Sequence, residues 1–292
     1  MPAQAAIGWA GDPFQGVMMY LLIASDLDGT LLLPGDTFGA FTKSVIHRLN
    51  RAGHHIVLAT GRHQADVESL LDSQSPPVHL ITANGARISS ACGGLALSAE
   101  LSTAVVQTLL EETRADTDLT INLYCRSGWL MSREDENLKD FSQNPDFQPT
   151  LCAAENLPLH AVQKVFFFQR SKDHDALLRL QARLEQRLGD QIGTVFTFPW
   201  CLEVMARDVS KGNALKQLAE FLNVPIQACI AFGDAMNDVD MLAGVGKGVL
   251  MGNAHAELRQ ALPEAEIIGR YTDEAVAHYL SKHLLKSADL PA

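Results

Sequence analysis

The stretch Tyr20-Leu-Leu-Ile-Ala-Ser-Asp26-Leu-Asp28-Gly-Thr joins a short apolar run to two aspartates and a glycine. The apolar run predicts a buried strand that ends in a polar loop. Alternate side chains of extended backbone point to the same side, so Asp26 and Asp28 can share one site. Two close carboxylates repel each other unless a cation or a shared proton relieves them. By itself, the pair could also be a plain solvated turn before a glycine. The rest of the sequence decides between a shared site and such a turn.

Strands and helices alternate after this stretch, which favours a parallel sheet. Ligands of such sheets collect at the carboxyl ends of the strands. Asp26, Thr60 and Asn84 each lie at or just past such an end, so we expect them to belong to one site. The apolar periodicity predicts further strands at 56–59 and 79–82, with helices at 38–52 and 63–73.

The regular alternation of strand and helix patterns stops after residue 86 and resumes at about residue 205. The segment 87–204 shows helix and strand patterns without regular alternation, which predicts a separate α+β module. The expected fold is therefore α/β, with a Rossmann-like parallel-sheet core formed by 19–86 and 205–292 and an inserted α+β cap domain at 87–204. Residues 1–18 are rich in Gly, Ala and Pro and are expected to form a flexible N-terminal extension.

Composition and charge exclude several classes of partner. A formal net charge of -11 argues against nucleic acid, because binding to its backbone needs clustered Lys and Arg. The apolar run 17–24 is far shorter than the roughly 18 residues of a membrane span. Five scattered cysteines without a C-x-x-C pair suggest neither disulfides nor zinc. We therefore expect a cytoplasmic protein without nucleic-acid or membrane partners, and the oligomeric state stays open.

Three later motifs follow the two aspartates in order. With Asp-Leu-Asp-Gly-Thr-Leu-Leu at 26–32, they resemble the four signatures of the haloacid dehalogenase superfamily. The segment between the second and third signatures resembles the α+β cap of the Cof-type subgroup. Four matches within residues 20–285 are more specific than any one of them. The three later motifs are Ala-Thr60-Gly-Arg62, Val-Ser-Lys211-Gly and Gly-Asp234-Ala-Met-Asn237-Asp238.

The resemblance implies a phosphatase in which Asp26 attacks phosphorus and becomes an aspartyl phosphate. Asp28 is the implied general acid and base, which protonates the leaving oxygen and then activates water. Phosphoryl transfer builds negative charge on the phosphoryl oxygens, and Thr60, Lys211 and Mg²⁺ would stabilise that charge. To act as an acid near neutral pH, Asp28 requires a pKa well above the ordinary value of about 3.9.

The implied cofactor is Mg²⁺, which suits a site built from oxygen ligands and phosphate. The resemblance assigns it to Asp26, the backbone carbonyl of Asp28, and Asp234. Asp238 is expected to orient either the metal shell or Lys211. Taken by itself, Asp238 could equally be the N-cap of the helix that follows.

Five residues are expected to bind the substrate phosphate, and several have simpler explanations. Lys211 alone reads as a solvated lysine at a helix start, Thr60 as a strand-end hydroxyl and Asn237 as an N-cap. Arg62 could reach phosphate through its donor fork or form a salt bridge to the cap. The expected set is Thr60, Gly61, Arg62, Lys211 and Asn237.

The expected partner is a small phosphorylated metabolite. The closer resemblance within the Cof-type subgroup implies hydrolysis of 4-amino-2-methyl-5-hydroxymethylpyrimidine diphosphate to the monophosphate. A broad sugar-phosphate or pyridoxal-phosphate phosphatase is the alternative within the same chemistry, and a non-catalytic phosphometabolite-binding protein is the alternative outside it. Trp129, Trp200 and Glu203 are the candidates for leaving-group contacts, although tryptophans in strands usually serve packing. The run 165–168, Val-Phe-Phe-Phe, reads as cap-sheet core.

Overall fold

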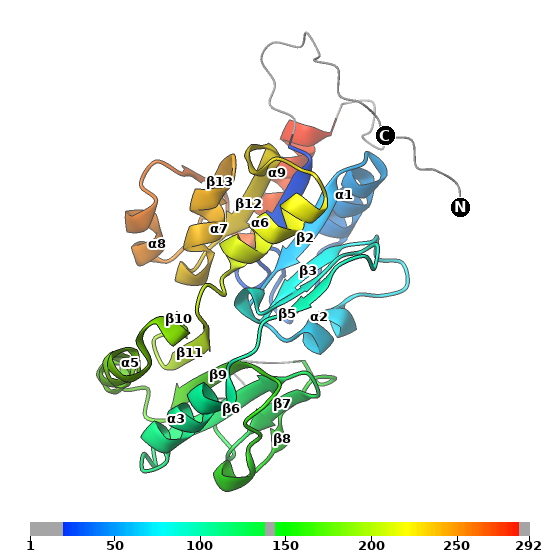
Figure 1. The fold of residues 1–292 in the computed structure, drawn as a ribbon. Coiled ribbons are helices and arrows are strands. Elements are labelled where there is room, and N and C mark those ends of the chain that lie inside the picture. Colours follow the sequence, from blue (N-terminus) through cyan, green and yellow to red (C-terminus); the bar gives the residue numbers. More distant parts are fainter. Residues whose placement is uncertain (1–19, 138–143, 286–292) are drawn as a thin grey trace.

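The computed structural model describes residues 20–137 and 144–285, and the predicted extension 1–18 lies outside this part of the chain. The described residues form two sheets. The first is built from segments at both ends of the chain, and the second from the segment between them (Figure 1). We call them the core sheet and the inserted sheet.

The core sheet has β1 near its centre, and six neighbouring strands, from β14 to β3, run parallel. The predicted β-α-β-α-β series and the parallel α/β core are thereby confirmed. Its eight strands within the described residues, in spatial order, are β14 (Glu266–Ile267), β13 (Lys247–Leu250), β12 (Cys229–Gly233), β1 (Leu22–Ser25), β2 (His55–Ala59), β3 (His79–Thr82), β4 (Arg87–Ser89) and β5 (Ala96–Ser98).

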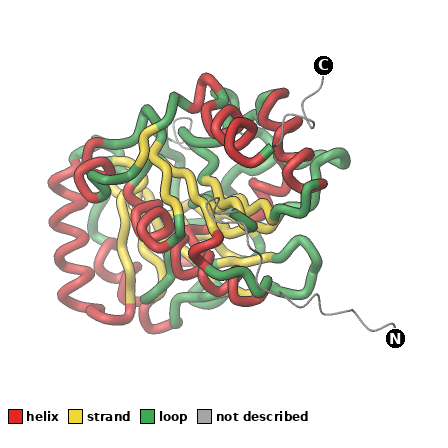
Figure 2. The backbone as a smooth tube through the Cα atoms, turned by 90° about the horizontal axis from the view of Figure 1, so that it is seen from above, coloured by secondary structure: helices red, strands yellow, loops and turns green. Residues whose placement is uncertain are grey.

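Helices cover both faces of the core sheet (Figure 2). Successive residues of a strand face opposite sides, and the burial of β1 shows this: Ile23 packs with one apolar cluster, while Leu22 and Ala24 pack with another. The first cluster holds α1 (Ala40–Arg51) and α9 (Ala275–Leu284) against the sheet. The second cluster holds α6 (Lys211–Phe221), α7 (Val239–Gly244) and α8 (Ala256–Ala261). The short α2 (Gln64–Leu70) follows β2.

The inserted sheet is mainly antiparallel. Its strand β9 (Val162–Gln169) has packed side chains on both faces. Val165 and Phe167 pack with α3 (Thr103–Thr113) and α5 (His174–Leu188) on one face. Phe166 and Phe168 lie in an aromatic cluster on the other face, which also contains Ala83 and Ala86 of the core. The run 165–168 is therefore packing, as predicted. The strands, in spatial order, are β10 (Ile192–Phe198), β11 (Cys201–Ala206), β9 (Val162–Gln169), β6 (Leu119–Cys125), β7 (Gly128–Met131) and β8 (Thr150–Leu151).

One boundary differs from the sequence analysis, which placed the start of the inserted segment at residue 87. Strands β4 and β5 pair antiparallel with the edge of the core sheet, next to β3. Residues 87–98 therefore extend the core sheet, because their backbone groups find partners there. No helix within 20–137 or 144–285 is long and apolar enough to cross a membrane.

Candidate active site

The predicted site residues lie at the carboxyl edge of the core sheet. Asp26 follows β1, Thr60 follows β2, Asn84 follows β3, and Asp234 follows β12. Strand β1 lies between β2 and β12. Helix α1 leads into β2 on one face of the sheet, and α6 leads into β12 on the other face. Such a point of divergence opens a crevice at the carboxyl ends of the strands. The edge therefore brings together residues that are distant in the sequence.

Lys211 lies at the centre of this edge and is completely buried. Its Nζ is 2.6 Å from Oδ1 of Asp26 and 2.7 Å from Oδ1 of Asp238. Burial by itself lowers the pKa of Lys211, but the charges of Asp238 and Asp26 outweigh it and raise the pKa above the ordinary lysine value. The Ser210 side chain caps α6 by accepting from the backbone N–H of Asn213 at 3.1 Å, which fixes Lys211 at the first helical position. The reading of Lys211 as a solvated lysine is wrong.

Asp238 is buried and accepts three hydrogen bonds. Besides Lys211, its carboxylate accepts from the backbone N–H of Asp234 at 3.0 Å and of Ala235 at 3.1 Å. Asp238 therefore orients both Lys211 and the loop that carries Asp234. Its side chain forms no capping hydrogen bond to the first turn of α7. The close packing requires Gly233, because a Cβ there would lie 2.6 Å from the Asp238 carboxylate.

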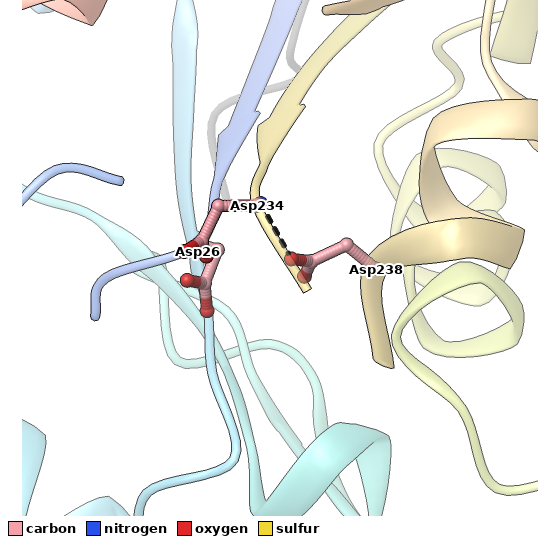
Figure 3. A group of neighbouring side chains, drawn as sticks. All are labelled: Asp26, Asp234 and Asp238. Carbon is pink, nitrogen blue, oxygen red and sulfur yellow. Dashed lines mark hydrogen bonds between the residues drawn. The ribbon is translucent and has the colours of Figure 1, made fainter. Parts of the chain in front are cut away.

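Asp26, Asp234 and Asp238 form a compact acidic group, with one oxygen of each lying within 4.8 Å of the others (Figure 3). Burial raises the pKa of Asp26 well above the ordinary aspartate value. Burial, and then the charge of Asp238, raises the pKa of Asp234 to about 7. The single positive charge of Lys211 faces three buried carboxylates and does not balance them. The excess negative charge and the all-oxygen donor set suit a divalent cation.

Asp234 is held in place by neutral donors. Thr30 Oγ1 lies 3.3 Å from Asp234 Oδ1, and Asn253 Nδ2 donates to Asp234 Oδ2 at 3.1 Å. Asn253 also donates to the backbone carbonyl of Gly29 at 2.8 Å, which ties the first motif to the loop after β13. Thr30 belongs to the quoted first motif, whereas nothing in the local sequence marks Asn253 as a partner of Asp234.

Asp28 lies apart from the acidic group and is half exposed. Both of its oxygens accept from Arg62, with Nε at 2.8 Å from Oδ2 and Nη2 bonded to Oδ1. Arg62 also pairs with Asp36, at 2.7 Å, and with Asp66, at 3.4 Å. These three carboxylates lie in the core, and Arg62 forms no salt bridge to the described residues of the cap, in contrast to one of the two expected alternatives. A contact between Arg62 and phosphate stays a prediction.

Three further predicted residues lie beside this site. Thr60 is fully buried, and its Oγ1 accepts from the backbone N–H of Arg62 at 3.2 Å. Gly61 lines the cavity described below, and so does Asn237, whose Nδ2 donates to Asn84 Oδ1 at 3.1 Å. All the predicted site residues are therefore near one another, although their roles stay predictions.

A cavity of about 450 Å³ opens over the site between the core and the inserted sheet. Glu203 lines it, whereas Trp129 and Trp200 are not among the described lining residues. Trp129 instead donates from Nε1 to Asn122 at 3.0 Å. Several other residues that line the cavity carry no signal in the local sequence, because only tertiary contacts bring them there: Asp36, Asp66, Tyr124, Thr197, Phe198, His255 and Tyr271.

The chain is similar to known proteins over almost all of its length. A family model described as haloacid dehalogenase-like hydrolase matches residues 23–280. A protein named HMP-PP phosphatase from Yersinia pestis (strain Pestoides F) is 39% identical over 272 residues, which cover 93% of this chain and 98% of the relative. A protein of the same name from Cronobacter sakazakii (strain ATCC BAA-894) is 39% identical, with 91% and 96% covered.

Solved structures show the same architecture. A haloacid dehalogenase-like hydrolase from B. subtilis has a TM-score of 0.78 and 25% identity, with 91% of this chain and 100% of that chain covered. Another, from Bacteroides thetaiotaomicron, has a TM-score of 0.77 at 24% identity, with 90% and 99% covered. The second match shows likeness of fold alone.

Proposed function

This chain belongs to the haloacid dehalogenase-like hydrolases, and on that premise we propose that it is a Mg²⁺-dependent phosphatase that works through an aspartyl phosphate. The observation that carries the proposal is the buried contact of Lys211 with Asp26 and Asp238, beside Asp234. A lysine that holds one carboxylate oxygen leaves the other oxygen of Asp26 for attack on phosphorus.

Charge stabilisation is the main task of such a site, since phosphoryl transfer involves little covalent work by the protein. Lys211 and the Thr60 hydroxyl are the proposed donors to the phosphoryl oxygens, a role supported by the contact of Lys211 with Asp26 and by the position of Thr60 just after β2. Asp26 and Asp234 would hold Mg²⁺, which when bound supplies positive charge to phosphate and nucleophile. Asp238 would act through Lys211 and the 234–235 backbone, to which it is hydrogen bonded. A backbone contact from Asp28 to the ion is part of the proposal.

Asp28 is the proposed general acid and base, and its pairing with Arg62 bears on that role. Asp28 lines the cavity, but both of its oxygens accept from the guanidinium. To give a proton to the leaving oxygen, Asp28 must release at least one of these hydrogen bonds. Arg62 can tolerate that release because Asp36 and Asp66 remain as partners. The Arg62 group would then be free to approach a substrate phosphate.

The proposed substrate is 4-amino-2-methyl-5-hydroxymethylpyrimidine diphosphate, which is cleaved to the monophosphate. The proposal is supported by 39% identity to proteins named HMP-PP phosphatase, matched over nearly their whole length. The cavity of about 450 Å³ is within the range of small-molecule sites. A cytoplasmic location belongs to the same proposal, since all five cysteines are free thiols and reducing compartments keep them so.

The decisive experiment replaces the nucleophile. Asp26→Asn keeps the shape of the side chain but removes the attacking carboxylate, so phosphate release from an aryl phosphate in Mg²⁺ should fall by about 10⁴-fold or more. Glu155→Gln, on the inserted segment, is the matched control and should retain wild-type kcat. Release should also stop in EDTA and return with added Mg²⁺. Full turnover by Asp26→Asn would refute the assignment.

The substrate is tested separately by a metabolite panel. We expect kcat/KM for the pyrimidine diphosphate to exceed that for hexose phosphates and pyridoxal phosphate by at least about tenfold, because differential contact with the leaving group sets such ratios. Equal values across the panel would favour the broad phosphatase. Tight binding of the metabolites without release of phosphate in saturating Mg²⁺ would instead favour the non-catalytic binding protein.

A further inference from the structure

A buried ion pair joins the inserted sheet to the loops of the active site. Lys164 in β9 and Glu203 in β11 lie 2.9 Å apart, and their side chains are 0% and 1% exposed. A buried pair of this kind gains little net stability over well-packed apolar residues, because removing both charges from water is costly. Its best-attested use is to fix one arrangement of the parts that it connects.

Each member of the pair also contacts the core. Lys164 Nζ donates to the backbone carbonyl of Gly61 at 2.8 Å, in the loop between Thr60 and Arg62. The second oxygen of Glu203 accepts from Asn84 Nδ2. The inserted sheet is thus hydrogen bonded to the loop after β2 and to the loop after β3.

The contacts continue to a third loop. Asn84 Oδ1 accepts from Asn237 Nδ2 at 3.1 Å, and Asn237 lies next to Asp238 in the loop after β12. The hydrogen bonds therefore run in an unbroken line from Gly61 through Lys164, Glu203 and Asn84 to Asn237. Lys164 Nζ also lies 4.5 Å from the centre of the Tyr124 ring, which limits its freedom to move elsewhere.

We propose that Lys164 and Glu203 are positioning residues, which set the phosphate-binding loops at their working separation when the inserted sheet covers the cavity. This inference rests on the proposed phosphatase function. Neither residue needs to touch the phosphate. Lys164 acts through the Gly61 carbonyl, and Glu203 acts through Asn84. Because the loops bind the phosphoryl group common to all substrates, the effect should not depend on the leaving group.

The test uses the double variant Lys164→Met/Glu203→Gln. Removing both charges avoids leaving one buried charge unpaired, so the variant should unfold within a few degrees of the wild type. It lacks the hydrogen bond to Gly61, however, and a loop displaced by a fraction of an ångström loses catalysis steeply. We expect kcat to fall about tenfold or more, by the same factor for an aryl phosphate and for the pyrimidine diphosphate. The affinity for inorganic phosphate in Mg²⁺, measured by calorimetry, should fall as well.

Two further variants separate positioning from stability. Phe167→Leu lies on the same strand but on the opposite face, in the cluster with α3 and α5, so it should lower the unfolding temperature while kcat and phosphate affinity stay unchanged. Lys164→Gln/Glu203→Gln also removes both charges but keeps hydrogen-bonding groups on both strands. It replaces the first double variant if that fails to fold, and smaller losses of kcat and phosphate affinity are then expected.

The outcomes are distinguishable. Wild-type kcat and phosphate affinity in the folded double variant would overturn the positioning role, and so would a loss confined to one leaving group or matched by Phe167→Leu. If the wild-type enzyme itself released no phosphate from any substrate and bound none in Mg²⁺, the proposed function would fail first.

Discussion

Gly29 is the residue that lets two distant segments meet in the active site. Its backbone has φ +73°, a conformation that favours glycine. A Cβ at this position would lie 2.3 Å from Oδ2 of Asp234. No other residue type can therefore occupy position 29 without displacing the Asp234 carboxylate. The glycine that follows the two aspartates in the sequence is explained by this contact.

Gly29→Ala should weaken Mg²⁺ binding. The added methyl group pushes Asp234 out of the acidic group, so we expect the Mg²⁺ concentration for half-maximal activity to rise about tenfold or more, with a lower kcat. Gly35→Ala is the matched control, because Gly35 has φ +84° but nothing lies within 4 Å of its Cβ position. Gly35→Ala should lower the free energy of unfolding by about 1 kcal/mol through backbone strain and leave the Mg²⁺ titration unchanged. Equal Mg²⁺ dependence in the two variants would contradict this account of Gly29.

Most of the candidate site could be predicted from the sequence because its residues stand in short motifs at strand ends. The contact of Lys211 with Asp26 and Asp238 follows from bringing those motifs to one edge. Two of the partners of Arg62, Asp36 and Asp66, could not be predicted, because they lie in segments that carry no motif. Lys164 was missed for a similar reason, since a lone lysine within an apolar strand gives no sign of its partner.

Among the elements, β2 and β3 carry a pair of histidines, buried His79 and half-buried His55, at the opposite end from the active site. Nδ1 of His55 and Nε2 of His79 are 3.2 Å apart. Nδ1 of His79 accepts from the backbone N–H of Ala91 at 3.2 Å, so the proton of neutral His79 is on Nε2 and is donated to His55. Burial, and then the charge of His55, lowers the pKa of His79 to about 4. Protonation of either ring would break this arrangement.

The pair should make stability depend on pH. The pKa of His79 is lower in the folded state than the ordinary 6.5, so the unfolded chain binds more protons between these values. This part of the stability is present above pH 6.5 and is lost as pH falls towards 4, at most by about 1.4 kcal/mol per pH unit.

The measurement is urea unfolding from pH 7 to pH 4.5 for the wild type and for His79→Gln. The difference between the two free energies of unfolding should shrink as pH falls, and this comparison cancels the opposite contribution of Asp234. A constant difference would rule out the histidine as its source.

The elements themselves were predicted well where burial is one-sided or complete. The predicted strands 56–59 and 79–82 and the predicted helix 38–52 agree with β2, β3 and α1 to within two residues at each end. Strands β4 and β5 were not predicted, because they are three residues long and β5 is partly exposed. Their membership of the core sheet is decided by the pairing of β4 with β3 and of β5 with β4, which short strands do not reveal in their own sequence.

For the whole molecule, a cation held by the acidic group would be a source of stability. Three carboxylates face one lysine, and the pKa of Asp234 is raised to about 7. A raised folded-state pKa means that this group favours folding at low pH, and that its contribution is lost as pH rises through 7. At pH 8 the native state therefore contains ionised Asp234 at a cost in stability, which a bound cation offsets.

Asp234→Asn should therefore raise the unfolding temperature in EDTA at pH 8, by roughly 2–4 °C for each kcal/mol recovered. The same variant should lose the stabilisation that Mg²⁺ gives the wild type, which at a hundredfold excess over Kd is about 2.7 kcal/mol. Scanning calorimetry with and without Mg²⁺ measures both effects. An Asp234→Asn variant that is less stable in EDTA but still stabilised by Mg²⁺ would contradict this role.

The position of β1 between β2 and β12 also governs how the enzyme is made. A ribosome releases β1 and β2 early, but β12 emerges only after the whole inserted segment has been synthesised. Until then one edge of β1 has no partner strand, and such edges pair readily with other chains. Asp26 also lacks its neighbours Lys211 and Asp234 until those residues have been synthesised. A nascent chain that stops before β12 would therefore carry an aggregation-prone strand edge and would lack Asp234 and Asp238, so chemistry becomes possible only after the inserted segment and β12 have been synthesised.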